Sequence, residues 1–240
     1  MRKILSLFAV LVAAISLHAA TITKVGDTFG SAGFYSVGQQ TAAFTYQVTK
    51  LPSGSTPGEC KLTAVDTKGL AYQNLYVPAS FEHTYSGSTK VFRLTAVGNR
   101  VFRDFTFENV LFGYTYGELP SYISFDEDAF LDCQSLLSLR WYTGTSNPDA
   151  SSVSWQSYIK FGDVADEAFL NCIKLMMPIE CGEILKNGGT NVTHKIGKYA
   201  FGNCYELTII VCGGSDIHQE AFNDCDKVHF LTWLGGTSSI

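Results

Sequence analysis

Cysteine and histidine are the residue types in this chain whose side chains could make a chemical site. There are seven cysteines and five histidines, which are the ingredients of disulfides, of a thiol nucleophile with a histidine base, and of a zinc site. Cys225 and His229 stand four residues apart, but no second pair of ligands accompanies them, and no Cys-x-x-Cys occurs. No histidine lies in a known nucleophile motif, and Gly-x-Ser-x-Gly is absent. The sequence therefore predicts no catalytic residue, no metal ion and no cofactor.

The motif Ala-Phe-x-x-Cys occurs four times and organises the chain. Aligned on its Phe, every copy has an apolar residue five positions before, an Asp or Asn two positions after, and Leu or Val six positions after. A degenerate fifth copy around Phe102 has Phe105 in the Cys position. Units that repeat in this way are typical of solenoids, in which stacked units bury a continuous core. The predicted core residues are Phe130, Cys133, Leu136, Phe169, Cys172, Leu175, Phe201, Cys204, Leu207, Phe222, Cys225 and Val228.

Each unit predicts a short helical turn followed by a short strand. Ala and Cys lie four apart, on the same side of one helical turn, and acidic residues such as Asp126–Asp128 just before it would favour its dipole. The Asp or Asn before Cys tolerates a left-handed conformation, which suits the end of the turn. Strands with alternating apolar residues follow. We expect three of them to pair side by side in one sheet: Ser138–Trp141, Ile209–Cys212 and Phe230–Trp233.

Two insertions and one irregular strand interrupt the array. Residues 144–159 and 182–194 are rich in Ser, Thr, Asn and Gly, which is typical of loops. In the second full repeat, Pro178 takes a strand position, where its missing N–H removes a hydrogen bond of the ladder. We expect a slip or bulge there, with Ile179 and Cys181 pointing inward.

The four repeat cysteines are predicted to be buried thiols rather than disulfides. An exported protein would ordinarily pair its cysteines. However, the degenerate copy fills the same slot with Phe, so the slot is a packing position, and free Cys behaves as a small buried hydrophobe. Seven cysteines also cannot all pair.

The first twenty residues are predicted to be a cleaved secretory signal. Arg2 and Lys3 form a basic start, residues 4–17 are apolar, and Ala19 and Ala20 are small enough for cleavage. The alternative, a membrane anchor, is disfavoured because the apolar run is short for a span of about 20 residues. No second apolar segment is long enough to span a membrane, and no Cys follows for lipid attachment. We expect an exported protein that is secreted, periplasmic or held at the cell surface.

The remaining chain is predicted to have two parts. Residues 21–90 lack the motif and are expected to form an N-terminal β cap, because an end repeat would otherwise expose its core. Residues 91–240 are expected to form a solenoid of about five irregular repeats. The net charge of −5 becomes about −7 once Arg2 and Lys3 are removed, which argues against a nucleic-acid partner.

The repeat resembles that of the BspA-like leucine-rich-repeat family of bacterial surface proteins, I-G-x-x-A-F-x-x-C-x-x-L. Residues 196–207 match it closely, and Leu75–Ser80 is similar to the family's L-x-I-P-S strand. Residues 84–98 are similar to its Y-N-G … V-x-x-I-G passage, and the resemblance extends over roughly residues 46–234. It implies an α/β repeat, mainly β: a leucine-rich-repeat solenoid with short strands on one face and short helical turns and loops on the other. It further implies adhesion without shared catalytic residues.

We expect the outer face of the sheet to bind the ligand, because it is regular and uninterrupted. The residues that alternate with the buried ones are Ser138, Arg140, Tyr142, Glu180, Ile209, Val211, Phe230 and Thr232. A merely solvated sheet is the alternative. The sequence thus predicts a non-enzymatic protein that binds a host, matrix or cell-surface protein or glycan. The alternative function is an exported enzyme or accessory factor with a site in the cap or the insertions, near His83 or Cys60.

The last strand, residues 228–234, is apolar and has no Lys, Pro or acidic residue to protect its edge. Such an edge can pair with another chain. We expect weak self-association through it; closure by residues 235–240, or by a neighbouring insertion, is the alternative.

Overall fold

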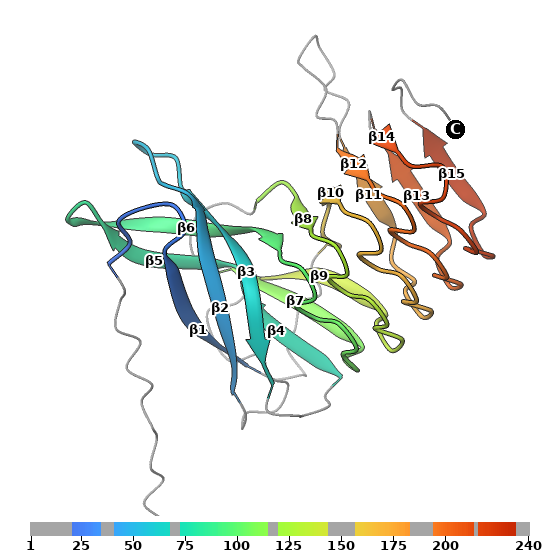
Figure 1. Cartoon of the computed structure of the whole chain (residues 1–240), viewed down its shortest axis with the longest axis horizontal. Helices are drawn as coiled ribbons and strands as arrows, with labels where there is room; N and C mark the ends of the chain where they lie inside the picture. Colours follow the sequence, from blue (N-terminus) through green and yellow to red (C-terminus); the bar gives the residue numbers. More distant parts are fainter. Residues whose placement is uncertain are drawn as a thin grey trace, which may run out of the picture.

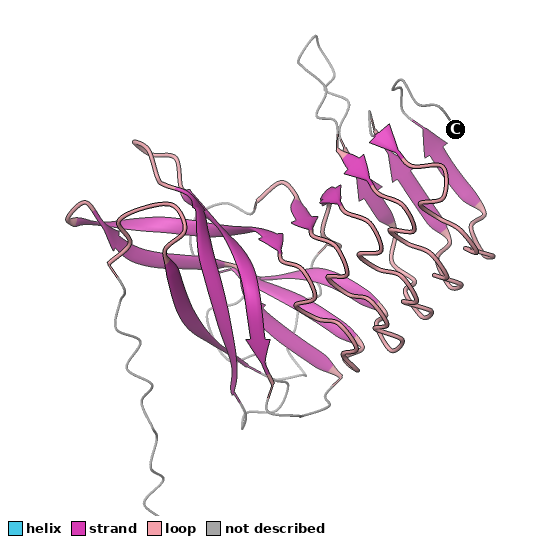
Figure 2. Ribbon diagram, viewed as in Figure 1, coloured by secondary structure: helices cyan, strands magenta, loops and turns pink. Residues whose placement is uncertain are grey.

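The computed structural model of the chain consists of strands and turns (Figures 1 and 2). It describes residues 21–34, 41–67, 73–114, 120–143, 157–182, 194–213 and 216–233. The predicted signal, residues 1–20, lies outside these ranges. No helix occurs in the described residues, so the mainly β prediction is confirmed. The prediction of short helical turns is wrong for the described repeats.

The N-terminal part consists of long strands that pair antiparallel within two groups. Strands β1 (Thr28–Phe34), β2 (Thr41–Lys50) and β3 (Gly58–Asp66) pair in sequence order. Every second residue of β2 from 42 to 48 is buried, which is the period that one covered sheet face requires. Strands β5 (Ser80–Tyr85) and β6 (Ser88–Val97) form a hairpin whose turn residues, Ser86 and Gly87, both have positive φ. The two groups join through the parallel pair β3 and β6.

From β6 onward the chain winds as a β-solenoid of about four turns, which runs from the centre to the right of Figure 1. A first parallel ladder joins β6, β8 (Ile123–Phe125), β10 (Phe161–Val164), β12 (Lys195–Ile196) and β14 (Asp216–Ile217). Each copy of the repeat has an apolar residue five positions before its Phe, and in this ladder that residue pairs with its equivalent in the next copy. The paired residues are, in order, Val97, Phe125, Val164, Ile196 and Ile217. The alignment of the repeats is therefore reproduced residue by residue.

The strands that follow each turn form a second ladder, which is divided in two. Strands β4 (Asn74–Pro78), β7 (Asn109–Tyr114) and β9 (Ser138–Thr143) make a separate three-stranded parallel sheet. Strands β11 (Ile179–Cys181), β13 (Ile209–Cys212) and β15 (Phe230–Trp233) pair in parallel within the larger sheet. The prediction that β9 shares a sheet with β13 and β15 is wrong.

The division has a local cause in the predicted loop 144–159. Its last residues run antiparallel to β9: the Trp141 N–H donates to the Ser157 carbonyl at 3.1 Å, and the Ile159 N–H donates to the Leu139 carbonyl at 3.4 Å. This segment occupies the edge of β9 that β11 would otherwise use. Ile179 and Cys181 are buried, as predicted, and β11 pairs with β13 without a shift of register.

The turns are kept open by left-handed residues. The Asp or Asn before the Cys slot has positive φ in all five copies: Asp104, Asp132, Asn171, Asn203 and Asp224. Left-handed residues direct alternate N–H groups toward the next coil, so the Phe130 N–H donates to the Ala168 carbonyl at 2.7 Å. A helical turn would use these donors within the coil, and the coils would lose the hydrogen bonds that stack them.

The acidic residues before the turn also bind across coils rather than to a helix dipole. A carboxylate oxygen of Asp166 accepts the Lys198 backbone N–H at 2.8 Å, and one of Asp163 accepts that of Lys195 at 2.8 Å. Asp128 is buried and accepts from the Arg100 guanidinium at 2.9 Å.

The core is a set of parallel side-chain columns. The rings of Phe102, Phe130, Phe169, Phe201 and Phe222 stack with centroids 4.6–5.2 Å apart. The predicted core residues of the first three full copies are buried, whereas Phe222, Cys225 and Val228 of the last copy are partly buried. All seven cysteines are free thiols.

Candidate functional site

The predicted binding face is closed over the three-stranded sheet. Ser138 is 4% exposed and donates to the side-chain oxygen of Asn109 at 2.7 Å, so its assignment to an exposed face is wrong. Tyr76 and Leu111 pair in register with Arg140 on the same row of this sheet, and they are 4% and 1% exposed. The row that was expected to meet a ligand is therefore buried over β4 and β7.

The two predicted anchors on β9 already have partners. The Arg140 guanidinium lies 4.0 Å from the centre of the Tyr158 ring, and its Nη2 donates to the Tyr158 hydroxyl at 2.6 Å. Tyr142 is half-buried, with its ring edge-on to Tyr76 at 5.6 Å, and burial raises the pKa of Tyr142. These contacts make Arg140 a structural residue at the segment that separates the two sheets, and Tyr142 a structural residue of the three-stranded sheet.

The face is open over the larger sheet. Glu180 on β11 is exposed, Ile209 on β13 is 38% exposed, and Val211 is partly exposed. Glu180 pairs in register with Val211, and Val211 with Thr232. The predicted contact residues Phe230 and Thr232 hold their expected positions in the β15 backbone; their side chains lie outside the described set.

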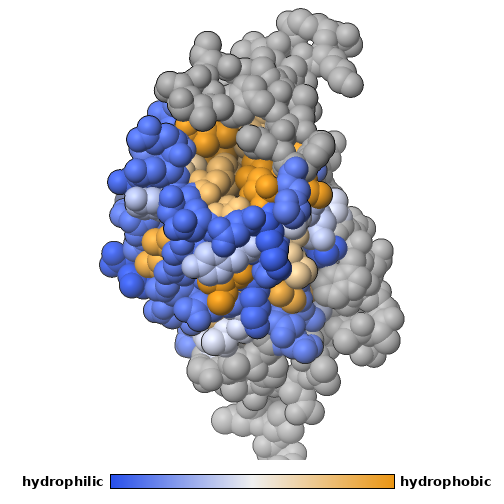
Figure 3. All heavy atoms as spheres, turned by 90° about the vertical axis from the view of Figure 1, so that its right-hand side faces the viewer, coloured by the Kyte–Doolittle hydropathy of each residue, from blue (hydrophilic) through white to orange (hydrophobic). Residues whose placement is uncertain are grey.

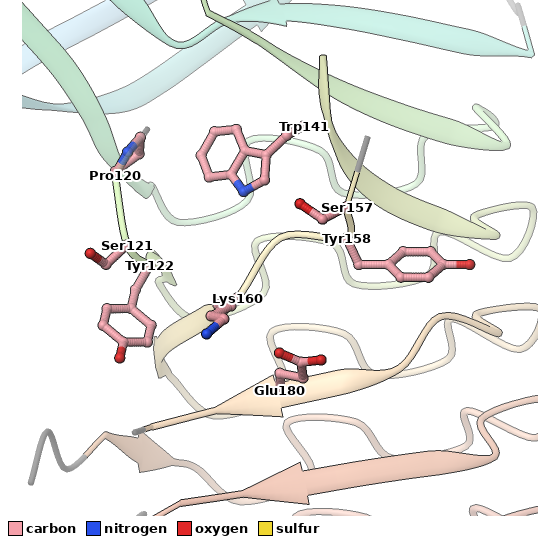
Figure 4. Close-up of a pocket in the computed structure, with 8 residues that line it drawn as sticks. All are labelled: Pro120, Ser121, Tyr122, Trp141, Ser157, Tyr158, Lys160 and Glu180. Carbon is pink, nitrogen blue, oxygen red and sulfur yellow. The ribbon is translucent and has the colours of Figure 1, made fainter. Parts of the chain in front are cut away.

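A pocket of about 390 Å³ lies where the two sheets separate (Figure 4). Four segments supply its walls: residues 120–122 ahead of β8, Trp141 on β9, the antiparallel segment with Tyr158, and Glu180 on β11. It exists because the segment at residues 157–159 separates β9 from β11 and leaves a gap in the ladder. The lining residues are Pro120, Ser121, Tyr122, Trp141, Ser157, Tyr158, Lys160 and Glu180.

The pocket combines apolar walls with unpaired polar groups. Trp141 is 5% exposed, and its indole nitrogen points toward the space between the lining residues (Figure 4). The side chains of Lys160 and Glu180 are exposed, and neither makes an ion pair or hydrogen bond with another described residue. The ring of Tyr158 points away from the pocket, toward its contact with Arg140.

One wall of the pocket is supported from behind by a histidine. The Tyr122 ring packs edge-on against His194, with centroids 4.5 Å apart. His194 Nδ1 lies 3.6 Å from a carboxylate oxygen of Asp163, and its buried Nε2 has no hydrogen-bond partner in the described part of the chain. This packing fixes the position of Tyr122.

Of the residues that line the pocket, the sequence predicts only one as a binding residue. Glu180 was predicted on the face, whereas Lys160 and residues 120–122 were not singled out, and Ser157 and Tyr158 fell in a predicted loop. The signal that could have revealed the segment is an alternation: Ile159 and Phe161 are buried, while Lys160 between them is exposed. An alternation of this kind predicts a strand.

The residues named for the alternative enzyme function lie in the packed cap. His83 is buried against Phe29, Phe81 and Phe92, and burial lowers its pKa. Cys60 is fully buried, and burial raises the pKa of its thiol. A thiol held protonated in this way is a poor nucleophile.

The last strand of the described residues is β15, which pairs with β13. Apolar side chains are visible at this end within a hydrophilic rim (Figure 3). The partly buried apolar residues of the last coil are Ile217, Phe222, Cys225 and Val228. The predicted closing segment, residues 235–240, lies outside the described residues.

The described residues contain no group of three or more His, Cys, Asp or Glu side chains arranged to hold a metal ion. They contain no helix long and apolar enough to cross a membrane.

Comparison with known proteins gives no relative from which to transfer a function. No protein-family model, curated protein or solved structure matches the chain.

Proposed function

We propose that this chain is an exported, non-enzymatic binding protein of the BspA-like leucine-rich-repeat type. Its ligand, a protein or glycan outside the cell, contacts the outward face of β11, β13 and β15 together with the adjoining pocket. One observation carries the proposal: Glu180 belongs to both surfaces, as the exposed central residue of β11 and as a wall of the pocket. The flat face and the pocket therefore form one continuous surface.

The composition of this surface supports binding. Ile209 is one of few large apolar side chains exposed in the described residues, and it lies one strand away from the charged Glu180. Interfaces combine apolar contacts with a polar rim. Because the strands are held in a regular parallel ladder, the surface is rigid and loses little entropy on binding.

Binding by the mature chain tests the proposal directly. The chain from residue 21 is applied to a panel of extracellular-matrix proteins and to a glycan array, and hits are quantified by surface plasmon resonance. Glu180→Lys and Ile209→Asp should each weaken the affinity at least about tenfold, equivalent to about 1.4 kcal/mol.

The matched control is Glu127→Lys, which makes the same charge change at an exposed position on the turn side of the solenoid. It should leave the affinity unchanged. Equal affinities of Glu180→Lys, Ile209→Asp and the unsubstituted chain would exclude this surface. Absence of any ligand across both panels would count against the binding function.

A further inference from the structure

The pocket beside Glu180 holds two opposite charges that do not neutralise each other. The Lys160 amine and the Glu180 carboxylate reach the same space from neighbouring segments (Figure 4). Neither is in an ion pair with another described residue, so each is available to a ligand. An ammonium group only donates hydrogen bonds and a carboxylate only accepts them. A ligand that satisfies both must offer a donor and an acceptor a short distance apart.

Three more polar groups surround the same space. Ser121 and Ser157 supply hydroxyls that can donate or accept, and the indole N–H of Trp141 can only donate. They come from three separate segments, so they are spread around the pocket rather than gathered at one end. A ligand must therefore carry polar groups around its whole edge.

We infer that this pocket takes one neutral sugar unit of a glycan, a ligand class that rests on the binding function proposed above. A sugar hydroxyl donates and accepts at once, so neighbouring hydroxyls satisfy Glu180 and Lys160 with a single kind of group. Hydrogen bonds to charged groups are shorter and stronger than neutral ones. An anionic ligand would face Glu180, and a cationic ligand would face Lys160.

Size and shape fit the same ligand. A volume of about 390 Å³ lies at the small end of the range of roughly 300–1,000 Å³ for small-ligand pockets. Pro120 and Trp141 give apolar wall against the C–H groups of a sugar ring, and Tyr122 is held in place by His194. Because Glu180 also belongs to the open face of β11, further units of the glycan would continue toward Ile209.

The probes for the test are neutral disaccharides: lactose, maltose, cellobiose, mannobiose and diacetylchitobiose. Each is titrated against the mature chain by saturation-transfer NMR and calorimetry. At least one should bind, and Glu180→Gln and Lys160→Met should each weaken its affinity about tenfold or more. Trp141→Phe, which keeps the aromatic wall and removes the N–H, should weaken it several-fold.

The matched controls are Glu82→Gln and Lys174→Met, which remove the same charges at exposed positions away from the pocket. They should bind as the unsubstituted chain does. Thermal unfolding of every variant separates a lost contact from a lost fold, because Lys160 and Glu180 are exposed and their variants should unfold at the unsubstituted temperature.

Two results would overturn the inference. Binding of a sugar with unchanged affinity in Glu180→Gln and Lys160→Met places the site elsewhere. Binding of glycine, free lysine or an anionic sugar in place of all five neutral probes assigns the pocket to a charged ligand. If a matrix protein binds and Glu180→Lys abolishes that binding while no sugar binds, the proposed function stands and only the sugar inference fails.

Discussion

The thiol of Cys172 donates a hydrogen bond to the backbone carbonyl of Phe130, one coil earlier, at 3.2 Å. The same contact joins each Cys of the repeat to the Phe of the preceding copy, from Cys133 with Phe102 to Cys225 with Phe201. Cysteine suits this position for two reasons. Its size fills a buried position, and its weak donor adds a second hydrogen bond to a carbonyl that already accepts a backbone N–H of its own turn, as the Phe130 carbonyl does from Cys133 at 3.2 Å.

Replacing Cys172 with Ala should lower the free energy of unfolding by about 1–2 kcal/mol, since it leaves a small cavity and removes one of the two hydrogen bonds to the Phe130 carbonyl. The measurement is urea unfolding followed by circular dichroism. Cys225→Ala is the matched control and should cost less, because Cys225 is only partly buried. Equal costs at the two positions would show that burial is not the cause.

The thiols should resist alkylation in the folded protein. Burial raises the pKa of Cys172 and Cys204 well above the ordinary value and that of Cys225 to about 11. At pH 8 the reactive thiolate is therefore scarce, and Cys225, which is partly exposed, should react first. Mass spectrometry at intervals after addition of iodoacetamide measures the order in which the cysteines are alkylated. Disulfides linking repeat cysteines to one another would contradict the prediction.

Substitution of Asn171, which lies in a turn of the solenoid, should lower the stability of the protein. Its amide donates to Asp132 at 2.7 Å and accepts from Asn203 at 2.7 Å, and its φ is +64°. Asn171→Asp places a carboxylate beside Asp132, so it should destabilise the protein at pH 7 by about 1–3 kcal/mol and less at pH 3. Asn171→Gly keeps the backbone conformation and tests the lost amide alone. A pH-independent effect of Asn171→Asp would exclude charge repulsion.

The cap should lose stability as the pH falls below neutrality. Burial among aromatic rings lowers the pKa of His83 from its ordinary 6.5, so the unfolded chain binds the proton more readily than the folded one. The contribution of His83 is complete above pH 6.5 and is lost progressively as the pH falls below it. Urea unfolding at pH 7.5 and 5.5 measures the change. His83→Leu should reduce the loss of stability, and an undiminished loss would assign it to other groups.

The edge of β15, the last described strand, should support weak self-association. In the described residues β15 pairs only with β13, and the last coil leaves apolar residues partly exposed. An unprotected edge can pair with that of a second copy. Sedimentation across a concentration series should show dimers at the highest concentrations, and Thr232→Lys should abolish them. A monomer throughout, unchanged by Thr232→Lys, would show that the end is already closed.

The sequence by itself determined the repeat and its core. Residues at equivalent positions of the Ala-Phe-x-x-Cys repeat form columns of side chains in the structure, because each one packs against its equivalent in the next coil. The left-handed conformation of Asn171 and its equivalents was also predicted, since Asn and Asp tolerate it. The predicted helical turn does not occur in the described repeats. The spacing of Ala and Cys fits a helix equally well, and only the hydrogen bonds between coils decide against it.

Only the tertiary structure decided which parts of the sheet face are open. Alternation along β9 predicts that Ser138 and Arg140 point outward, and it cannot tell that a segment nineteen residues after Leu139, at Tyr158, returns to pair with that strand. The return places the Tyr158 ring against Arg140, separates the two sheets and forms one wall of the pocket beside Glu180. Local periodicity fixes the direction of a side chain, whereas exposure depends on which distant segment comes to cover it.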